Sequence, residues 1–341
     1  MLQTDSLYIY EGTPFGNIML KSSFSELYSL GFRPGDSINV HFSRGAVLDD
    51  IPFLSGCILP EGMLCLNAHE GFNWVRIEKR FGRAWDLYEI SESETAVIIL
   101  NESQKYAFLQ DTFNAGFSLS RDCYPSDEAF ANYRSLRGGN IKENRFYRST
   151  ASFDPYYDRP EFIARQKMLD NLLCRDRIQF VVNMTCSNVQ METIFSSRVY
   201  NGAYLYKLYE AGGIYSDLFP ADFSKPEFKS ALLSALRVLM DHEGPYLIQC
   251  RAGLDRTGFV SGLLEALAGA NPEEIAEDYM CSYGNLCGLT KEKDPQKYGT
   301  ILRYQVDRIL KTVSYGSAEA YLEECGMSAF EISRLKQILS E

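Results

Sequence analysis

The sequence contains no long hydrophobic run and no excess of basic charge. Nowhere do about 18 apolar residues follow one another, which is the length a membrane-spanning helix needs. The first twenty residues lack the charged segment and apolar core of an export signal. We therefore expect no membrane insertion and a cytoplasmic location. Because 34 basic residues face 45 acidic ones, for a formal net charge of -11, a nucleic-acid partner is not expected either.

Histidine is scarce and cysteine is scattered. The three histidines, His41, His69 and His242, are isolated from one another, and packing or surface positions explain them better than catalysis. The nine cysteines are odd in number and show no paired spacing of the kind that holds zinc. We interpret them as reduced thiols and expect no metal and no cofactor.

A length of 341 residues favours two domains, since single cores stop growing at a few hundred residues. Up to about residue 110, short apolar runs rich in Tyr, Ile and Val alternate with Gly, Asp and Asn. This pattern predicts an all-β barrel or sandwich, which we assign to residues 1–115. One helix is expected within it, where Ser23 and Glu26 fit a capping box and Gly31 fits a C-terminal stop.

Residues 116–341 alternate helical and strand patterns, and this alternation predicts an α/β domain. In this domain Asp158 and Ser224 are the expected caps of two helices. The expected helices are 158–173, 224–242 and 257–269, followed by a helical region from 272 onward; the expected strands are 178–184 and 245–249, with 202–210 as a possible further strand.

The stretch LIQCRAGLDRTGFV, residues 247–260, carries the strongest chemical signal. Five residues separate Cys250 from Arg256, and Gly253 allows successive backbone N–H groups to converge on an anion. The following helix adds the positive end of its dipole, and the guanidinium can bind two oxygens of a tetrahedral dianion. The same field favours the thiolate of Cys250, which would then face phosphorus as a nucleophile. Thr257 can donate its hydroxyl to that sulfur when a covalent intermediate breaks down.

The string CRAGLDRTG resembles the phosphate-binding loop of the cysteine-based protein tyrosine phosphatase superfamily, and most of all its bacterial tyrosine phosphatase family, some members of which act on phosphoinositides. A second stretch, 132–152, is similar to that family's Arg-x-x-x-Gly-Gly run followed by Tyr-Arg-Ser. The resemblance covers about residues 125–340. It implies a phosphatase fold, a Cys250 nucleophile and an Arg256 phosphate clamp without metal. The loop positions that it implies for substrate binding are Arg251, Ala252, Gly253, Leu254 and Gly258.

Two residues depart from the family pattern. Gln249 stands where the family usually has His before the cysteine, and Leu254 stands where phosphoinositide-active members carry Lys. We therefore expect hydrolysis of phosphotyrosine proteins or small phosphomonoesters through a phosphocysteine. A weakly active or inactive phosphate-reading module is the alternative that Gln249 raises. A phosphoinositide or inositol-polyphosphate phosphatase is the alternative that Leu254 disfavours, although Arg251 could partly replace the missing Lys.

A general acid is expected on a loop upstream of the cysteine. Asp217 lies 33 residues before Cys250 and is the first candidate, Asp222 at 28 residues is the second, and Asp255 within the loop is the third. Arg148 is a candidate substrate contact on a positive rim, or a structural hydrogen-bonding residue near the loop.

The N-terminal stretch from about residue 5 to 100 resembles the small C-terminal β-barrel of S-adenosylmethionine hydroxide adenosyltransferases, notably in PFGNIML and LGFRPGDSINV. That family forms its adenosine site with a larger catalytic domain that this chain lacks. The resemblance therefore implies a fold and no activity. A structural cap on the phosphatase core is the expected role, with substrate orientation or dimerisation as alternatives.

Overall fold

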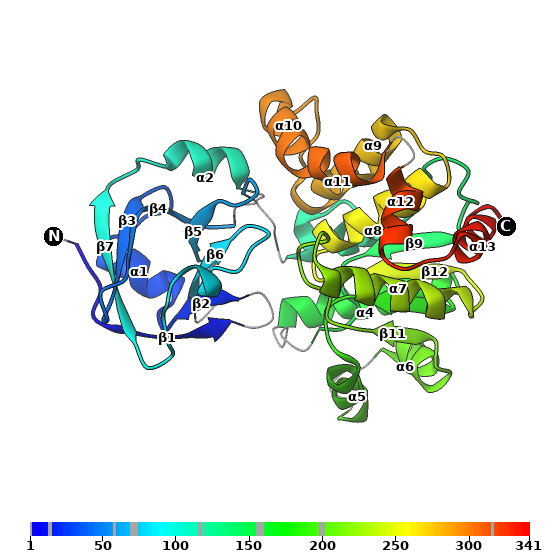
Figure 1. Cartoon of the computed structure of the whole chain (residues 1–341), viewed down its shortest axis with the longest axis horizontal. Helices are drawn as coiled ribbons and strands as arrows, with labels where there is room; N and C mark the ends of the chain where they lie inside the picture. The colour runs from blue at the N-terminus through cyan, green and yellow to red at the C-terminus, as the bar shows by residue number, and fades with distance from the viewer. Residues whose placement is uncertain are drawn as a thin grey trace. The chain divides into compact units, whose positions relative to one another are not determined.

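The chain forms two compact units in the computed structural model (Figure 1). The first comprises Met1–Phe117 with Gly299–Tyr304, and the second comprises Ser118–Tyr298 with Gln305–Glu341. The structure describes residues 2–12, 16–56, 59–68, 74–114, 118, 120–154, 160–197, 202–314 and 317–341. The boundary predicted between residues 115 and 116, the cap Asp158 and His69 lie outside the described residues. Among the described residues, no helix has the length and apolar character needed to cross a bilayer.

The first unit is a closed barrel, which confirms the predicted all-β domain. Its strands are β1 (Leu7–Gly12), β2 (Asn17–Leu20), β3 (Ser37–Phe42), β4 (Val47–Leu54), β5 (Leu64–Asn67), β6 (Val75–Lys79) and β7 (Thr95–Glu102). They follow the order β1-β2-β6-β5-β4-β3-β7, and β1 closes the barrel against β7. All of the pairs are antiparallel except β4 with β5.

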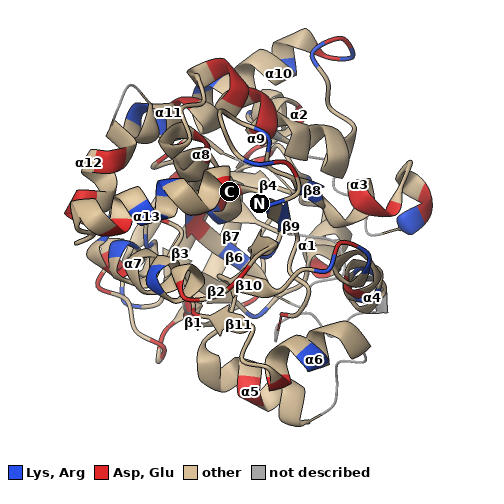
Figure 2. Cartoon of the chain, turned by 90° about the vertical axis from the view of Figure 1, so that its right-hand side faces the viewer, with Lys and Arg blue, Asp and Glu red and all other residues tan. Residues whose placement is uncertain are grey.

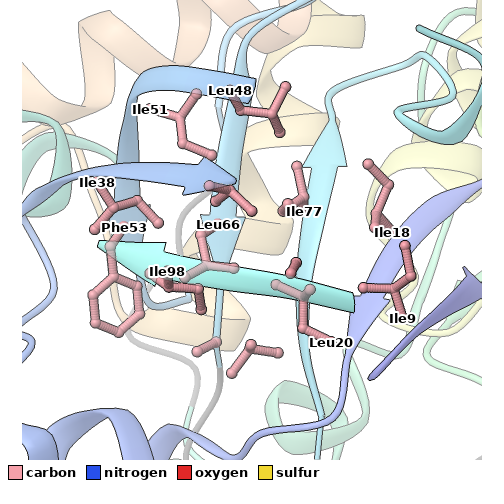
Figure 3. Close-up of a cluster of buried hydrophobic side chains, with 14 of the residues drawn as sticks. Ile9, Ile18, Leu20, Ile38, Leu48, Ile51, Phe53, Leu66, Ile77 and Ile98 are labelled. Atoms are coloured by element: carbon pink, nitrogen blue, oxygen red, sulfur yellow. The ribbon is translucent and has the colours of Figure 1, made fainter. Parts of the chain in front are cut away.

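Alternate side chains of these strands fill the barrel, as the close-up in Figure 3 shows. Ile18, Ile38 and Ile77 are among the fully buried members of this core. The helix α1 (Phe24–Leu30) has the predicted capping box between Ser23 and Glu26. The helix stops at Gly31, whose backbone is in the left-handed region. The other short helical segments here are Trp85–Leu87 and α2 (Ala107–Phe113).

Strand β4, VLDDIPFL, lies outside the short apolar runs from which the strands of this unit are predicted. Its first half is largely exposed, and Asp50 has a left-handed backbone (φ 54°) at an irregularity in the pairing with β3. Pro52 then pairs with Ser37. Two aspartates and a proline interrupt the period of two by which a strand is recognised, so the pattern hides this strand.

The second unit is built on a five-stranded sheet in the order β11-β10-β12-β9-β8. Its strands are β8 (Arg134–Ser135), β9 (Phe146–Ser149), β10 (Phe180–Asn183), β11 (Ile214–Ser216) and β12 (Tyr246–Gln249). Strands β11, β10, β12 and β9 are parallel, and β8 runs antiparallel to β9. Parallel strands place their carboxyl ends at one edge of the sheet, where such folds locate their sites.

Helices flank this sheet, and the predicted α/β class is confirmed. Helix α8 packs on β12 and β9, α7 packs on β10 and β11, and α4, α5 and α6 share a buried cluster with Val181 and Leu247. Figure 2 shows acidic residues on outer helices such as α9 and α12 and basic residues on α7. The described helices of this unit are α3 (Asp127–Ala131), α4 (Pro160–Arg175), α5 (Asn188–Ser196), α6 (Ala203–Glu210), α7 (Pro226–Met240), α8 (Asp255–Leu267), α9 (Pro272–Cys287), α11 (Asp307–Val313), α12 (Ser317–Glu324) and α13 (Ala329–Ser340), with a short 3-10 turn at Arg121–Cys123. The helix α10 (Pro295–Ile301) and a π-helical turn at Leu302–Val306 are divided between the two units, because Gly299–Tyr304 belongs to the first.

Two sequence predictions in this unit were wrong. The possible strand 202–210 is the helix α6, whose Leu205 and Leu208 are buried three residues apart, and the strand follows it as β11. A short apolar run fits both periods, so spacing alone could not separate them. Ser224 does not cap α7, because Lys225 occupies that position and Ser224 donates to Asp222 instead.

Candidate active site

The loop from Cys250 to Leu254 connects β12 to α8 at the carboxyl edge of the sheet. All four residues of β12 are buried, and Cys250, directly after them, is only 3% exposed. The loop therefore follows a buried central strand and opens a helix, which is the arrangement that directs backbone N–H groups and a helix dipole at an anion.

Gly253 is required by the path of this loop. Its φ is +64°, in the left-handed region that side chains disfavour. A Cβ atom at this position would overlap the carbonyl of Ser149 and lie 2.8 Å from the nitrogen of Thr150. The loop thus passes against the end of β9 at a distance that only glycine permits.

Side chains from outside the loop hold its carbonyl groups. The Nδ2 atom of Asn132 donates to the carbonyls of Ala252 (3.3 Å) and Gly253 (3.1 Å), and Nη2 of Arg148 donates to the Gly253 carbonyl at 2.8 Å. In a planar trans peptide, the N–H of the next residue points opposite to the carbonyl. The N–H groups of Gly253 and Leu254 therefore point away from these donors, and that of Gly253 donates to the Cys250 carbonyl at 3.1 Å.

Arg148 supports the loop through its buried side chain, which donates to the Gly253 carbonyl. Its side chain is 0% exposed, forms an ion pair with Asp278, and also donates to Ser282 at 3.3 Å. Arg134 binds the same carboxylate at 2.8 Å. Burial alone would raise the pKa of Asp278, but the charges of Arg134 and Arg148 outweigh burial and hold that pKa below its ordinary value.

Glu265 of α8 completes this buried group of charges. Burial, together with the negative charge of Asp278, raises the pKa of Glu265 well above its ordinary value. Its side chain fills the space beside Gly138, where a Cβ would lie 2.7 Å from its Cγ. At Gly139 (φ +61°), a Cβ would lie 2.6 Å from the carbonyl oxygen of Ala268. The Gly-Gly pair noted in the sequence thus lets this segment pass against α8.

Arg256 is buried in the first turn of α8 and reaches the ends of two neighbouring strands. Its Nη1 donates to the carbonyl of Met184, after β10, and to that of Phe219, after β11, at 3.2 Å. The next residue, Thr257, is fully buried, and its Oγ1 has no hydrogen-bond partner among the described residues. Because buried hydroxyls are normally hydrogen-bonded, the Thr257 hydroxyl is available to donate a hydrogen bond to a bound substrate or to the sulfur.

Gly258 serves helix packing. A Cβ at this position would lie 2.5 Å from the ring of Tyr279, so glycine lets α9 approach α8 there. The hydroxyl of the same tyrosine donates to Asp255 at 3.2 Å. These contacts give Gly258 a structural function in helix packing, and the substrate contact that the family resemblance implied stays a prediction.

Arg251 is bound to Asp154 through two hydrogen bonds, of 2.9 and 3.4 Å. The carboxylate is 0% exposed, whereas the Arg251 side chain is 32% exposed. The carbonyl of Arg251 accepts from the Ala151 N–H at 3.2 Å. Leu254 is buried at the N-cap position of α8, and its apolar side chain accepts no hydrogen bond from the first helical turn. The positive charge beside Cys250 is therefore matched by a buried negative one.

Gln249 fills the place of the family's histidine with two specific hydrogen bonds. Its Oε1 accepts from the Ser152 N–H at 3.0 Å, and its Nε2 donates to Oδ1 of Asn183 at 3.2 Å. The side chain is fully buried. An amide thus ties the start of the loop to β10 and to the segment after β9, without an ionisable ring.

The three candidate acids differ in their partners, and Asp255 accepts from the hydroxyl of Tyr279 on α9. Asp222 forms an ion pair with Arg308 at 2.8 Å and accepts from Ser224. Asp217 follows β11 directly, is partly exposed, and accepts from the N–H of Leu218 at 2.7 Å and the hydroxyl of Tyr215 at 3.5 Å. Asp222 is thus committed to a structural ion pair, whereas Asp217 bonds to chain neighbours.

Sequence reasoning missed the residues that support the loop from a distance. These are Asn132, Asp278, Glu265, Asp154 and Asn183. Asn132 is the first residue of the stretch 132–152 that carries the family resemblance, and Asp278 lies within the range 125–340 that this resemblance covers. Among the described residues, no group of three or more His, Cys, Asp or Glu side chains is placed to hold a metal ion.

The fold and the loop together define the class: an α/β phosphatase-type unit with a cysteine on the loop after a central strand and an arginine in the first turn of the helix that follows. Residues 212–341 match the family model described as the tyrosine phosphatase family. The matched residues include Cys250 and Arg256, so the match agrees with the family resemblance predicted from the sequence.

The individual proteins to which this chain is similar are also phosphatases. A tyrosine-protein phosphatase of Nostoc commune is 34% identical over 137 residues, which is 35% of this chain and 46% of the relative. The chain thus spans about half the length of that curated relative. Among solved structures, the catalytic core of the PP-IP phosphatase SIW14 from S. cerevisiae is 17% identical (56% of this chain, 94% of that one; TM-score 0.28). TpbA from P. aeruginosa in complex with pTyr is 19% identical (54% and 96%; TM-score 0.28). The likeness of the barrel to adenosyltransferases stays a prediction.

Replacement of Gly253 by Ala should weaken binding of inorganic phosphate by about tenfold or more, because the loop must move away from Ser149 and lose an aligned donor. Isothermal titration calorimetry measures this. Gly284→Ala on α9, whose added Cβ would meet its nearest atom at 3.6 Å, is the matched control. Equal affinities for the two variants would contradict the assignment of this loop as the anion site.

Replacement of Glu265 by Gln should stabilise the fold increasingly as pH rises above the ordinary pKa of a glutamate. In that range the native state holds a proton that the unfolded chain has released, so wild-type stability falls by up to about 1.4 kcal/mol per pH unit. The Gln variant has no carboxyl at this position and therefore lacks this pH-dependent loss of stability. Denaturant unfolding at pH 5 and pH 8 tests it, and a constant difference between the two proteins would show that Glu265 is ionised in the fold.

Proposed function

We propose that this protein hydrolyses phosphomonoesters of the phosphotyrosine type through a phosphocysteine on Cys250. The observation that carries the proposal is the loop itself, with a buried cysteine at its start, carbonyls held outward and Arg256 in the first helical turn. Backbone N–H groups and a guanidinium there suit the three non-bridging oxygens of a phosphoryl group. The match to the tyrosine phosphatase family supports the same chemistry.

The reaction has two steps. The Cys250 thiolate attacks phosphorus, an S–P bond forms, the P–O bond to the leaving group breaks, and Asp217 protonates the departing oxygen. Water then attacks the phosphocysteine and gives a proton to the Asp217 carboxylate, which restores the acid, while the S–P bond breaks to release inorganic phosphate and the thiolate. Thr257, whose hydroxyl is buried beside the loop, stabilises the departing sulfur.

The charge beside the loop supports a monoester over a polyphosphate. Arg251 is the cation nearest in sequence to the nucleophile, but it is bound by the buried Asp154. Leu254 supplies no ammonium where phosphoinositide-active relatives of the motif carry one. A second phosphate would thus meet an ion pair and an apolar side chain in place of an unbalanced cation.

An inactive phosphate reader is the alternative function, and Gln249 is the residue that favours it. The amide cannot carry the positive charge that a histidine can, so it gives the Cys250 thiolate less electrostatic support. An inactive phosphate-reading module would bind phosphate and hydrolyse no phosphomonoester.

The first test of the proposed function is hydrolysis of 4-nitrophenyl phosphate in the presence of chelator. Wild type should turn over, and Cys250→Ser should lower kcat by about a thousandfold or more, because serine is a poor nucleophile here. Inositol hexakisphosphate, tested in parallel, should be a far weaker substrate. Phosphate binding without turnover would favour the reader, and activity unaffected by Cys250→Ser would exclude the phosphocysteine.

The second test separates the three candidate acids. Asp217→Asn should lower kcat on phenyl phosphate by about a hundredfold and much less on 4-nitrophenyl phosphate, whose better leaving group needs little protonation. Asp222→Asn and Asp255→Asn are the comparison variants. A leaving-group effect confined to either of those would move the acid to that residue.

A further inference from the structure

Asn183 occupies the junction of the two segments that carry the proposed nucleophile and acid. It is the last residue of β10 and is fully buried. In the sheet register it lies directly between Gln249 at the end of β12 and Ser216 at the end of β11. The residue after Gln249 is Cys250, and the residue after Ser216 is Asp217.

The side chain of Asn183 binds both neighbours at once. Its Oδ1 accepts from Nε2 of Gln249 at 3.2 Å and from Oγ1 of Thr185 at 2.9 Å. Its Nδ2 donates to Oγ of Ser216 at 3.0 Å and to Sγ of Cys186 at 3.3 Å. The amide therefore uses its acceptor toward the nucleophile segment and a donor toward the acid segment.

The backbone repeats the link in the same place. The carbonyl of Asn183 accepts from the N–H of Asp217 at 3.1 Å, and the N–H of Met184 donates to the carbonyl of Gln249 at 3.0 Å. These bonds extend the parallel ladders to the first residue of the segment that carries the acid. The Oγ of Ser216 in turn donates to the carbonyl of Cys186 at 2.8 Å, which fixes the hydroxyl as an acceptor for the Asn183 amide.

We propose that Asn183 is a positioning residue that couples the placement of the acid Asp217 to that of the nucleophile Cys250. This inference rests on the proposed function, since it needs both residues in their assigned roles. An asparagine suits the task because one amide both accepts and donates in fixed directions. An aspartate of the same shape keeps the acceptor but has no N–H for Ser216, so it releases the acid segment.

The test uses the leaving-group dependence of kcat, because this dependence reports acid catalysis and not overall folding. Asn183→Asp should lower kcat on phenyl phosphate by about tenfold or more and on 4-nitrophenyl phosphate only slightly. The double variant with Asp217→Asn should be no slower on phenyl phosphate than Asp217→Asn alone, because the acid is already absent. The control is Asn188→Asp, which makes the same change at an exposed residue of α5 and should have the kcat of the wild type on both substrates.

Ser216→Ala probes the same link from its other end and serves if Asn183→Asp does not fold. It removes the acceptor of the Asn183 donor and should give the same leaving-group effect. Equal losses on both substrates, or losses that multiply with that of Asp217→Asn, would overturn the coupling while leaving Cys250-dependent turnover in place. Absence of turnover in the wild type would instead overturn the proposed function.

Discussion

The Gly253 carbonyl, held from behind by Arg148 and Asn132, is the interaction on which the candidate site depends. Because a trans peptide is planar, fixing that oxygen also fixes the N–H of Leu254 on the opposite side. The left-handed Gly253 then brings the loop against the end of β9. The loop therefore owes its shape less to its own sequence than to donors that lie more than 100 residues away in the chain.

Those donors are themselves costly to bury, which explains the polar group beneath the loop. A fully buried guanidinium needs a charged partner, and Asp278 supplies it for Arg148 and Arg134 together. Against the effect of burial, the charges of Arg134 and Arg148 lower the pKa of Asp278, whereas burial raises the pKa of Glu265. The pKa shift of Glu265 favours a net positive charge in this group, which lies on the side of the loop from which Arg148 reaches Gly253. Such a field favours a dianion on that loop.

The sequence predicted the parts of the fold that local rules decide. The strand before Cys250, the helix after it, the α1 capping box and the need for glycine at 253 all follow from residues close together in the chain. It missed the strand β4, where aspartates and a proline break the period, and it misread α6 as a possible strand. The supports of the site could not be predicted in the same way, because nothing in the spacing of Arg148 and Asp278 says that the two meet across 130 positions.

The same distinction explains how Gln249 can replace a histidine. A histidine before the nucleophile would orient the loop and also carry charge, and an amide can perform only the first task. Here that task is shared, since Gln249 binds Ser152 on one side and Asn183 on the other, so the start of the loop is anchored between two segments. In the proposed mechanism the second task falls to groups other than residue 249, namely Arg256, the helix dipole of α8 and the buried arginine beneath Gly253. Orientation and charge, which one histidine could combine, are thus separated in this loop.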